Sequence, residues 1–234
     1  MIGTEFSKSF IESNYLLIAA GVSNSQETDP SVFARDTRNI ESIVVKHFDK
    51  KIFYISSCQN EDINFQTPYF LHKRLLEKIL LEKHKNTMIL RLPQVVGINN
   101  NMTLFPTLVR KMYLSESLNI QKNTKRVLID VADVVRIVQT IITKKFFESG
   151  IFNITPSYSV NVEDLVALIK EQITSHSEIK IVGPGRSAFV DDKYLHKLVS
   201  QDDILLDRLY ASLLVNKYVP QIIEQFSKDW KEQL

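Results

Sequence analysis

Glycine and cysteine are scarce in this chain of 234 residues, and neither sign of charge predominates. Six glycines stand where average usage of about 7% would give roughly sixteen, so a standard G-x-G-x-x-G phosphate-binding loop is excluded. A single cysteine, Cys58, excludes an intrachain disulfide and a zinc site built from cysteines. Lys and Arg number 29 against 27 Asp and Glu, so the net charge of +2 favours neither nucleic acid nor an anionic membrane as a partner.

Long apolar runs are also missing. No segment approaches the ~18 apolar residues of a membrane span, and the first residues lack the charged-then-apolar order of a signal peptide. The five histidines show no metal-ligand spacing. We therefore expect no membrane partner, no metal site and, by default, a cytoplasmic location.

Short apolar runs alternate with amphipathic stretches along the chain, which is the pattern of an α/β fold. Asp29 before Pro30 and Asp130 are predicted to cap helices. Strands are predicted at residues 15–20, 52–56, 88–92, 127–129, 151–154 and 178–182. Helices are predicted from residue 30 onward, at residues 69–83, 104–113, 131–147 and 162–173, and at the end of the chain.

The most informative segment is Tyr-Phe-Leu-His-Lys at residues 69–73. Tyr69 and Lys73 lie one helical turn apart on the same face. A lysine ammonium beside a phenol favours the phenolate and lowers its pKa from ~10, which suits an acid or base acting on a hydroxyl or carbonyl. Ser57 ends a predicted strand, where α/β sheets place their sites, and its hydroxyl is positioned to bind the same substrate oxygen. His72, inside the motif, could face the site or solvent, and solvent is the expected side.

Six segments occur in one order along residues 15–175. They are Ile-Ala-Ala-Gly at 18–21, Ser-Ser at 56–57, Tyr-x-x-x-Lys at 69–73 with Glu77 four residues later, Arg-x-Pro-Gln-x-x-Gly at 91–97, the segment from Arg126 to Asp133, and Gly-Ile-Phe-Asn-Ile at 150–154. In this order they resemble the extended short-chain dehydrogenase/reductase family of NAD-dependent nucleotide-sugar epimerases, dehydratases and reductases. The resemblance implies a Rossmann-like parallel sheet flanked by helices.

The resemblance also implies a role for each matched residue. Tyr69 would be the general acid/base, Lys73 would lower its pKa and hold the nicotinamide ribose, and Ser57 would orient the substrate carbonyl. Gln94 and Arg126 would bind the nucleotide-sugar substrate, Arg126 through the diphosphate; a loop-stabilising amide and a surface ion pair are the alternatives. The residues expected to bind NAD or NADP are Gly3, Ala20, Gly21, Ser56, Lys73 and Pro93.

The N-terminal part departs from the family pattern. The family begins with a strand, a Gly-rich turn and a helix, followed by two further strand–helix units that hold the adenosine half of the coenzyme. Here fourteen residues precede Tyr15, and Glu5 and Lys8 stand where the second and third glycines belong. A carboxylate at that place would repel a pyrophosphate. Either the coenzyme half is largely deleted, or a compact variant holds its cofactor differently.

We expect a truncated Rossmann-like domain of residues 1–97 and about 126–155, and a small C-terminal α/β substrate lobe of about 98–125 and 156–234. The expected function is an NAD(P)-dependent reductase or epimerase/dehydratase-type enzyme of polysaccharide biosynthesis. The alternatives are a degenerate, non-redox protein that binds a sugar nucleotide, and cofactor-free chemistry. The resemblance further implies a homodimer through the helices with Ile43 and Tyr69–Lys73, in which Leu71 and Leu75 either contact the partner or pack on the sheet.

Overall fold

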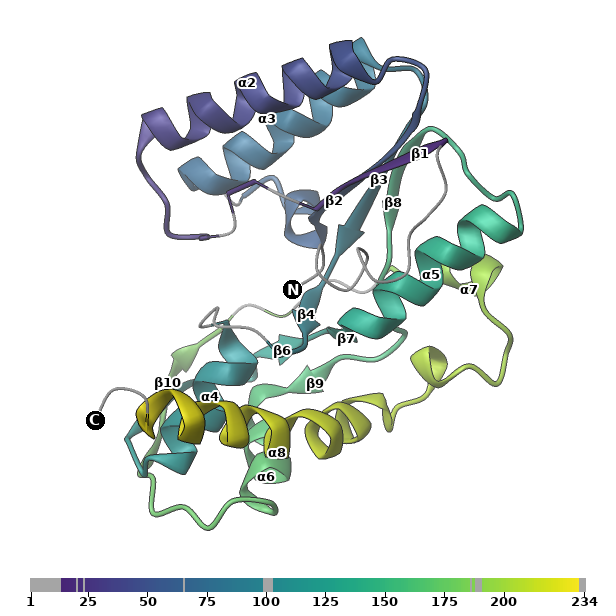
Figure 1. Cartoon of the computed structure of the whole chain (residues 1–234). Helices are drawn as coiled ribbons and strands as arrows, with labels where there is room; N and C mark the ends of the chain where they lie inside the picture. The colour runs from purple at the N-terminus through teal and green to yellow at the C-terminus, as the bar shows by residue number, and fades with distance from the viewer. Residues whose placement is uncertain are drawn as a thin grey trace.

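The computed structural model describes residues 14–19, 21–22, 24–64, 66–98, 103–185, 187 and 191–231. Its main sheet is parallel and has the strand order β1 (Tyr15–Ile18), β2 (Lys51–Ser57), β3 (Thr87–Leu92) and β8 (Gly150–Asn153). Helix α2 (Pro30–Lys46) connects β1 to β2, and α3 (Pro68–Lys83) connects β2 to β3; the two helices lie together over the sheet (Figure 1). The predicted α/β fold with a parallel sheet and flanking helices is confirmed.

The helix boundaries follow from local signals in the sequence. Asp29 accepts a hydrogen bond from Ser31 N, and Pro30 occupies the first helical position, as predicted for α2. Asp130 caps α5 (Val131–Thr143) by accepting from Ala132 N at 2.8 Å. The prediction that this helix continues to residue 147 is wrong, because Lys145 adopts φ +58°, a left-handed conformation that ends a helix.

Two hydrophobic cores lie on opposite faces of the sheet, because successive residues of a strand point to opposite sides. On β2, Tyr54 belongs to the small core under α2 and α3, whereas Phe53 belongs to the large core. The large core also contains the buried face of α5 and continues into the rest of the chain. The small core consists of Ile18, Ile40, Val44, Ile52, Tyr54, Leu76, Leu80 and Ile89.

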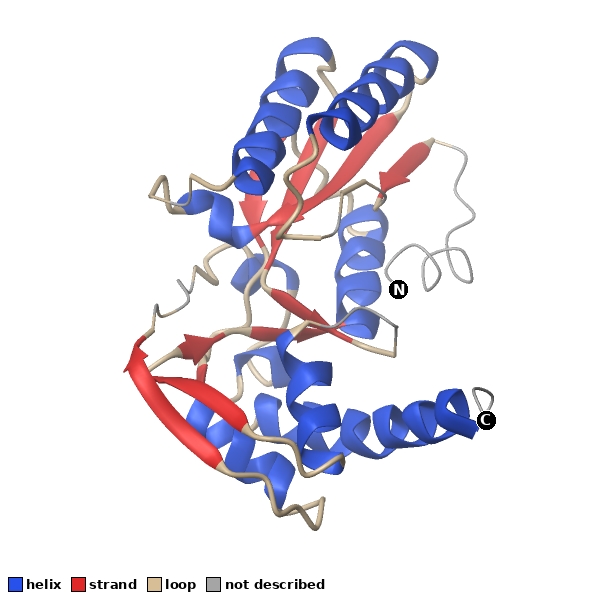
Figure 2. Cartoon of the chain, turned by 90° about the vertical axis from the view of Figure 1, so that its left-hand side faces the viewer, coloured by secondary structure: helices blue, strands red, loops and turns tan. Residues whose placement is uncertain are grey.

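The remaining elements form three two-stranded pairs and a group of helices (Figure 2). The pairs are β4 (Gln94–Val96) with β7 (Leu128–Asp130), β5 (Leu118–Lys122) with β10 (Ile179–Pro184), and β6 (Lys125–Arg126) with β9 (Val160–Asn161). The helices are α4 (Leu104–Tyr113), α6 (Val162–Lys170), α7 (Leu195–Leu198) and α8 (Tyr210–Lys231). No helix in the described part of the chain is both long and apolar enough to cross a membrane.

Helix α8 is held to this region by a buried acidic residue. Asp130, which caps α5, also accepts from Lys217 Nζ at 2.5 Å and from Tyr218 Oη at 2.6 Å. Tyr210 Oη accepts from Asp130 N and donates to Asp133. These bonds join the first half of α8 to β7 and α5, so the C-terminal helix packs as part of the fold.

Candidate functional site

Ser57 and Tyr69 lie near the carboxyl edge of the main sheet. Ser57 is the last residue of β2 and caps the short 3-10 helix η1 (Cys58–Glu61), its Oγ accepting from Gln59 N at 3.3 Å. Tyr69 is in the first turn of α3, and both side chains are half-buried. Because a helix that follows a parallel strand begins at the carboxyl edge of the sheet, the fold brings these two hydroxyls to the edge where α/β proteins bind ligands.

Lys73 is buried, with 6% of its surface exposed. Its Nζ donates a hydrogen bond to Tyr54 Oη at 3.4 Å. The same nitrogen lies 5.6 Å from the centroid of the Tyr54 ring and 5.8 Å from that of Tyr69, within cation–π range of both. The ammonium is therefore held between two tyrosine rings, of which Tyr54 was not expected from the sequence.

Burial decides how these groups titrate. It raises the pKa of Tyr69, and the negative charge of Asp36 raises that pKa further. Burial lowers the pKa of Lys73, while Asp36 and Glu77 oppose the change. That Lys73 lowers the pKa of Tyr69 stays a prediction, and in this structure burial and the charge of Asp36 act in the opposite direction. Tyr69 is protonated at neutral pH, which makes its phenol a proton donor.

A buried carboxylate supports the end of β2. Glu77, 3% exposed, accepts from Ser56 Oγ at 2.6 Å and from Asn60 Nδ2 at 2.8 Å. It also accepts two bonds from Arg91, from Nε at 3.0 Å and from Nη2 at 2.6 Å. Ser56, expected to bind the coenzyme, thus commits its hydroxyl hydrogen to Glu77. The network ties β2, η1, α3 and β3 together next to Ser57.

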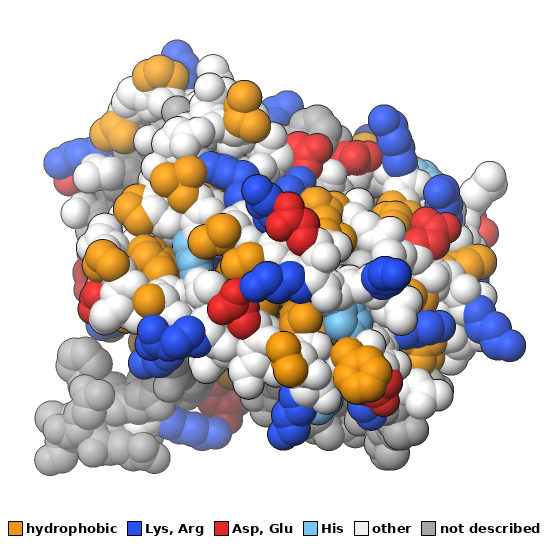
Figure 3. All heavy atoms as spheres, turned by 90° about the horizontal axis from the view of Figure 1, so that it is seen from above, with side chains coloured by type: hydrophobic (Ala, Val, Ile, Leu, Met, Phe, Trp, Pro, Cys, Tyr) orange, Lys and Arg blue, Asp and Glu red, His pale blue; other side chains and the backbone are white. Residues whose placement is uncertain are grey.

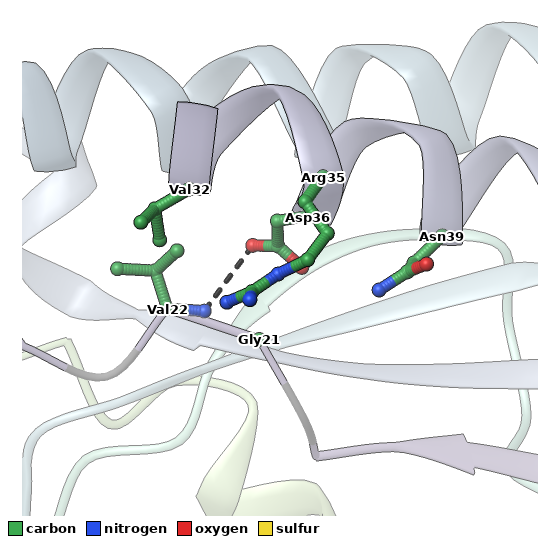
Figure 4. Close-up of a pocket in the computed structure, with 6 residues that line it drawn as sticks. All are labelled: Gly21, Val22, Val32, Arg35, Asp36 and Asn39. Atoms are coloured by element: carbon green, nitrogen blue, oxygen red, sulfur yellow. Dashed lines mark hydrogen bonds between the residues drawn. The ribbon is translucent and has the colours of Figure 1, made fainter. Parts of the chain in front are cut away.

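The loop after β1 lines a cavity of about 210 Å³ against α2 (Figure 4). Gly21, expected at the coenzyme groove, lines this cavity with φ +124°, whereas Gly3 and Ala20 lie outside the described residues. Asp36 points from α2 toward the loop and accepts from Val22 N at 3.2 Å. This amide is therefore already bonded to a carboxylate.

His72 is buried, contrary to the expectation that it faces solvent. Its Nε2 lies 3.0 Å from Asp36 Oδ2, and its ring lies 4.7 Å from that of Phe33, centroid to centroid. Sequence reasoning missed this pair because Asp36 is on another helix. The only local signal is spacing, since His72 follows Tyr69 by three residues and so shares its helix face.

Gln94 and Pro93 lie where β3 passes into β4. With its amide oxygen facing α4, Gln94 accepts from Leu104 N and Phe105 N, both at 3.1 Å. Thr103, the residue before α4, makes no side-chain capping bond. Gln94 therefore accepts hydrogen bonds from backbone N–H groups at the start of α4, which is the loop-stabilising alternative. Pro93, the residue before it, is half-buried.

Arg126 lines a separate cavity of about 220 Å³ in the C-terminal part of the chain. It is half-buried, burial lowers the pKa of its guanidinium, and Nη1 donates to Lys125 O at 2.9 Å. The wall of this cavity also includes Lys125, Arg208 and Tyr158. It is a basic cavity whose lining residues include neither Ser57 nor Tyr69.

The described residues contain no group of three or more His, Cys, Asp or Glu that could hold a metal ion. Cys58 is buried, and burial raises the pKa of its thiol to about 11, so it is an unreactive core residue.

A model of the NAD dependent epimerase/dehydratase family matches residues 5–155, which is more than half of the chain. The chain belongs to this family, and the resemblance drawn from the sequence motifs is confirmed. No curated protein sequence matches the chain significantly.

Solved structures show the same fold at low sequence identity. UDP-N-acetylglucosamine 4-epimerase from Methanobrevibacter ruminantium M1, in complex with UDP-N-acetylmuramic acid, is 18% identical with a TM-score of 0.68 over 91% of this chain and 77% of that one. UDP-glucose 4-epimerase from Thermotoga maritima with UDP-glucose is 18% identical, with a TM-score of 0.67 over 94% and 81%. dTDP-glucose 4,6-dehydratase from Bacillus anthracis with NAD is 13% identical, with a TM-score of 0.64 over 93% and 76%. The Rossmann-like fold predicted from the sequence is confirmed.

The described residues suit one half of a nicotinamide dinucleotide. Lys73 and Tyr69 offer an ammonium and a phenol of the kind that binds a ribose hydroxyl and a substrate oxygen, and Ser57 offers a second hydroxyl. In the loop after β1, Val22 N is bonded to Asp36 and is not free to bind a coenzyme. The donor set fits the nicotinamide end of NAD or NADP.

Proposed function

We propose that this protein is an NAD- or NADP-dependent enzyme that acts on a nucleotide-activated sugar as an epimerase, dehydratase or reductase. The proposal rests on one observation: Ser57, Tyr69 and Lys73 lie on β2 and α3, the elements that meet at the carboxyl edge of the parallel sheet. Membership of the NAD dependent epimerase/dehydratase family supports the coenzyme. Structures of similar fold that contain UDP-sugars support the substrate class.

In the direction of carbonyl reduction, Tyr69 would act as an acid. Its phenol is protonated at neutral pH, since burial raises a pKa that already lies well above 7, and it would donate its proton to a carbonyl oxygen of the sugar. The phenolate that remains is stabilised by the Lys73 ammonium beside the ring. Ser57 donates a hydrogen bond to the same oxygen and fixes its position. The nicotinamide, when bound, would supply the hydride to the carbonyl carbon in this direction; in the reverse direction it would accept the hydride while the Tyr69 phenolate takes the proton of the sugar hydroxyl.

The nucleotide end of the substrate would bind in the basic cavity of Arg126. A diphosphate carries two negative charges and several acceptor oxygens, and arginine binds such groups through paired N–H donors. Arg126 and Arg208 line the cavity, and the Tyr158 ring beside them offers a face for a base. The proposed lobe of about 98–125 and 156–234 then holds the nucleotide, and the residues of the main sheet hold the reacting sugar.

Coenzyme binding is the first test of the proposed function. We expect calorimetry or NAD(P)H fluorescence to show binding at micromolar to millimolar concentration, and thermal shifts with one nucleotide among UDP-, GDP-, CDP- and dTDP-sugars. The matching sugar should then be converted, as followed by chromatography of the products. Absence of NAD(H) and NADP(H) binding up to millimolar concentration would overturn the proposal.

A non-redox sugar-nucleotide-binding protein is the second candidate. The bond from Val22 N to Asp36 favours this candidate. It places a carboxylate beside the loop after β1, at the cavity where a coenzyme was expected to bind. In that case a nucleotide sugar binds and NAD(H) does not.

We also propose a homodimer through α2 and α3. Leu71 and Leu75 lie one turn apart on α3, each 47% exposed. Val45, near the end of α2, and Phe48, just after it, are each 76% exposed. Figure 3, a view onto these helices, shows hydrophobic side chains among lysines and arginines. Of the two expectations for Leu71 and Leu75, packing against the sheet is wrong, because both face outward.

Leu75→Glu is expected to convert the dimer to a monomer, since a charge would be buried at the centre of the contact. Sedimentation velocity at micromolar concentration measures the change. Leu213→Glu on α8 is the matched control, because Leu213 is also 47% exposed but lies on α8, at the opposite end of the molecule. A wild-type protein that sediments as a monomer refutes the dimer.

A further inference from the structure

One carboxylate joins three segments that are distant in the sequence. Asp36, on α2, is 6% exposed. Its Oδ2 accepts from Val22 N at 3.2 Å in the loop after β1, and lies 3.0 Å from His72 Nε2 on α3 (Figure 4 shows the Val22 bond). The loop expected at the coenzyme and the helix that carries Tyr69 and Lys73 are thus fastened to the same group.

Gly21, in the loop after β1, lies directly against the Asp36 carboxylate. A Cβ on Gly21 would stand 2.9 Å from Asp36 Oδ1 and 3.0 Å from Oδ2, closer than such atoms approach. Gly21 also has φ +124°, a conformation that favours glycine. The position of the loop therefore depends on where the Asp36 carboxylate is held.

His72 holds the carboxylate from the other side. It is 5% exposed, and the Phe33 ring packs against its imidazole. Burying a carboxylate and an imidazole is costly, and apolar residues of similar volume often stabilise a core as well or better. Such a pair is therefore better explained as a device that fixes geometry than as a source of stability.

We propose that Asp36 and His72 are positioning residues, which set the loop after β1 and the Tyr69–Lys73 turn of α3 in one fixed arrangement for coenzyme binding and proton transfer. This inference rests on the proposed function. Among the described residues, the charged and titratable groups around Asp36 are His72, Lys73 and Tyr69 on α3, Tyr54 on β2, and Arg35 of its own helix in the cavity (Figure 4), with Glu77 acting on the same lysine. Asp36 thus joins the loop after β1 to α3, and its negative charge also acts on Tyr69 and Lys73.

Asp36→Asn keeps the shape and removes the charge, and His72→Gln keeps a donor and removes the imidazole. We expect each to raise the KM for NAD(P)H about 5- to 10-fold with a smaller change in kcat, because the loop is released. Since the Asp36 charge raises the pKa of Tyr69, Asp36→Asn should also move the high-pH limb of kcat to lower pH. A purely structural residue would not move this limb.

Glu41→Gln is the matched control. Glu41 and Lys83 also join α2 to α3, at 2.6 Å, but their side chains are 42% and 52% exposed. It should leave the KM within two-fold and the pH profile unchanged. If Asp36→Asn and His72→Gln both behave like this control, the inference is wrong while the proposed function stands.

Amide hydrogen exchange in the free protein gives a second readout that needs no coenzyme. We expect the Val22 amide to exchange at least tenfold faster in both variants than in the wild type, and Glu41→Gln to leave it unchanged. Unchanged protection of Val22 overturns the inference. If the wild type binds no coenzyme but the exchange rates change as expected, the proposed function fails, and what remains is that Asp36 and His72 fasten the loop after β1 to α3. His72→Gln decides the matter if Asp36→Asn does not fold.

Discussion

Tyr69→Phe is expected to lower kcat by about 100- to 10,000-fold, the usual contribution of one general acid or base. The substitution removes only the hydroxyl. The ring keeps its edge-to-face contact with Phe70 at 5.0 Å and its place beside the Lys73 ammonium. Coenzyme affinity and thermal stability should therefore change little, and steady-state kinetics with the matching nucleotide sugar would measure the loss.

Tyr113→Phe provides the control, because Tyr113 is 41% exposed on α4 and its hydroxyl bonds only to Ser227 at 3.2 Å among the described contacts. It should retain wild-type kcat. Equal activity of the two variants would remove Tyr69 from the proposed mechanism. The direction of the pH dependence is a further test. For carbonyl reduction, wild-type kcat should fall as the pH rises through the pKa of Tyr69, which burial places above its usual value.

Glu77→Ala is expected to lower the free energy of unfolding by about 3–5 kcal/mol. Glu77 accepts from four donors, on Ser56, Asn60 and Arg91, and its removal leaves a largely buried guanidinium and two buried polar groups without this acceptor. The end of β2 next to Ser57 should loosen as well, so any activity should fall with the stability. Urea denaturation measures the change.

Glu82→Ala tests whether this effect belongs to the buried network. Glu82 is on the same helix, and its only ion pair among the described residues is with Lys78 at 3.8 Å, with both side chains more than 60% exposed. Exposed pairs of this spacing contribute about 0.3–0.5 kcal/mol. A Glu77 variant no less stable than the Glu82 variant would show that the network does not support the fold.

Much of the architecture was predictable because its signals are local. Asp29-Pro30 and Asp130 fixed the starts of α2 and α5, and apolar runs located all four strands of the main sheet. The strands β4, β5, β6 and β9 were not predicted, because they are short, carry polar residues and form only through pairing with distant partners. The end of α5 was missed for a related reason, since no glycine or proline marks the left-handed turn at Lys145.

The candidate site was predictable in its residues and not in its contacts. The spacing of Tyr69 and Lys73 places them on one helix face whatever the rest of the fold does. Residues 73–85 are rich in lysine and glutamate, a composition typical of a solvated helix face, yet Lys73 and Glu77 are buried. Their partners Tyr54 and Arg91 come from neighbouring strands, and no periodicity in α3 indicates them.

The sequence by itself determined the family, through six motifs in one order, and the α/β alternation that carries them. It also determined that Tyr69 and Lys73 share a helix, because four residues make about one turn. Only the tertiary structure decided that Lys73 contacts Tyr54, that Asp36 joins His72 to Val22, and that the pKa of Tyr69 is raised. These features depend on burial and on contacts between distant segments, which the order of residues does not record.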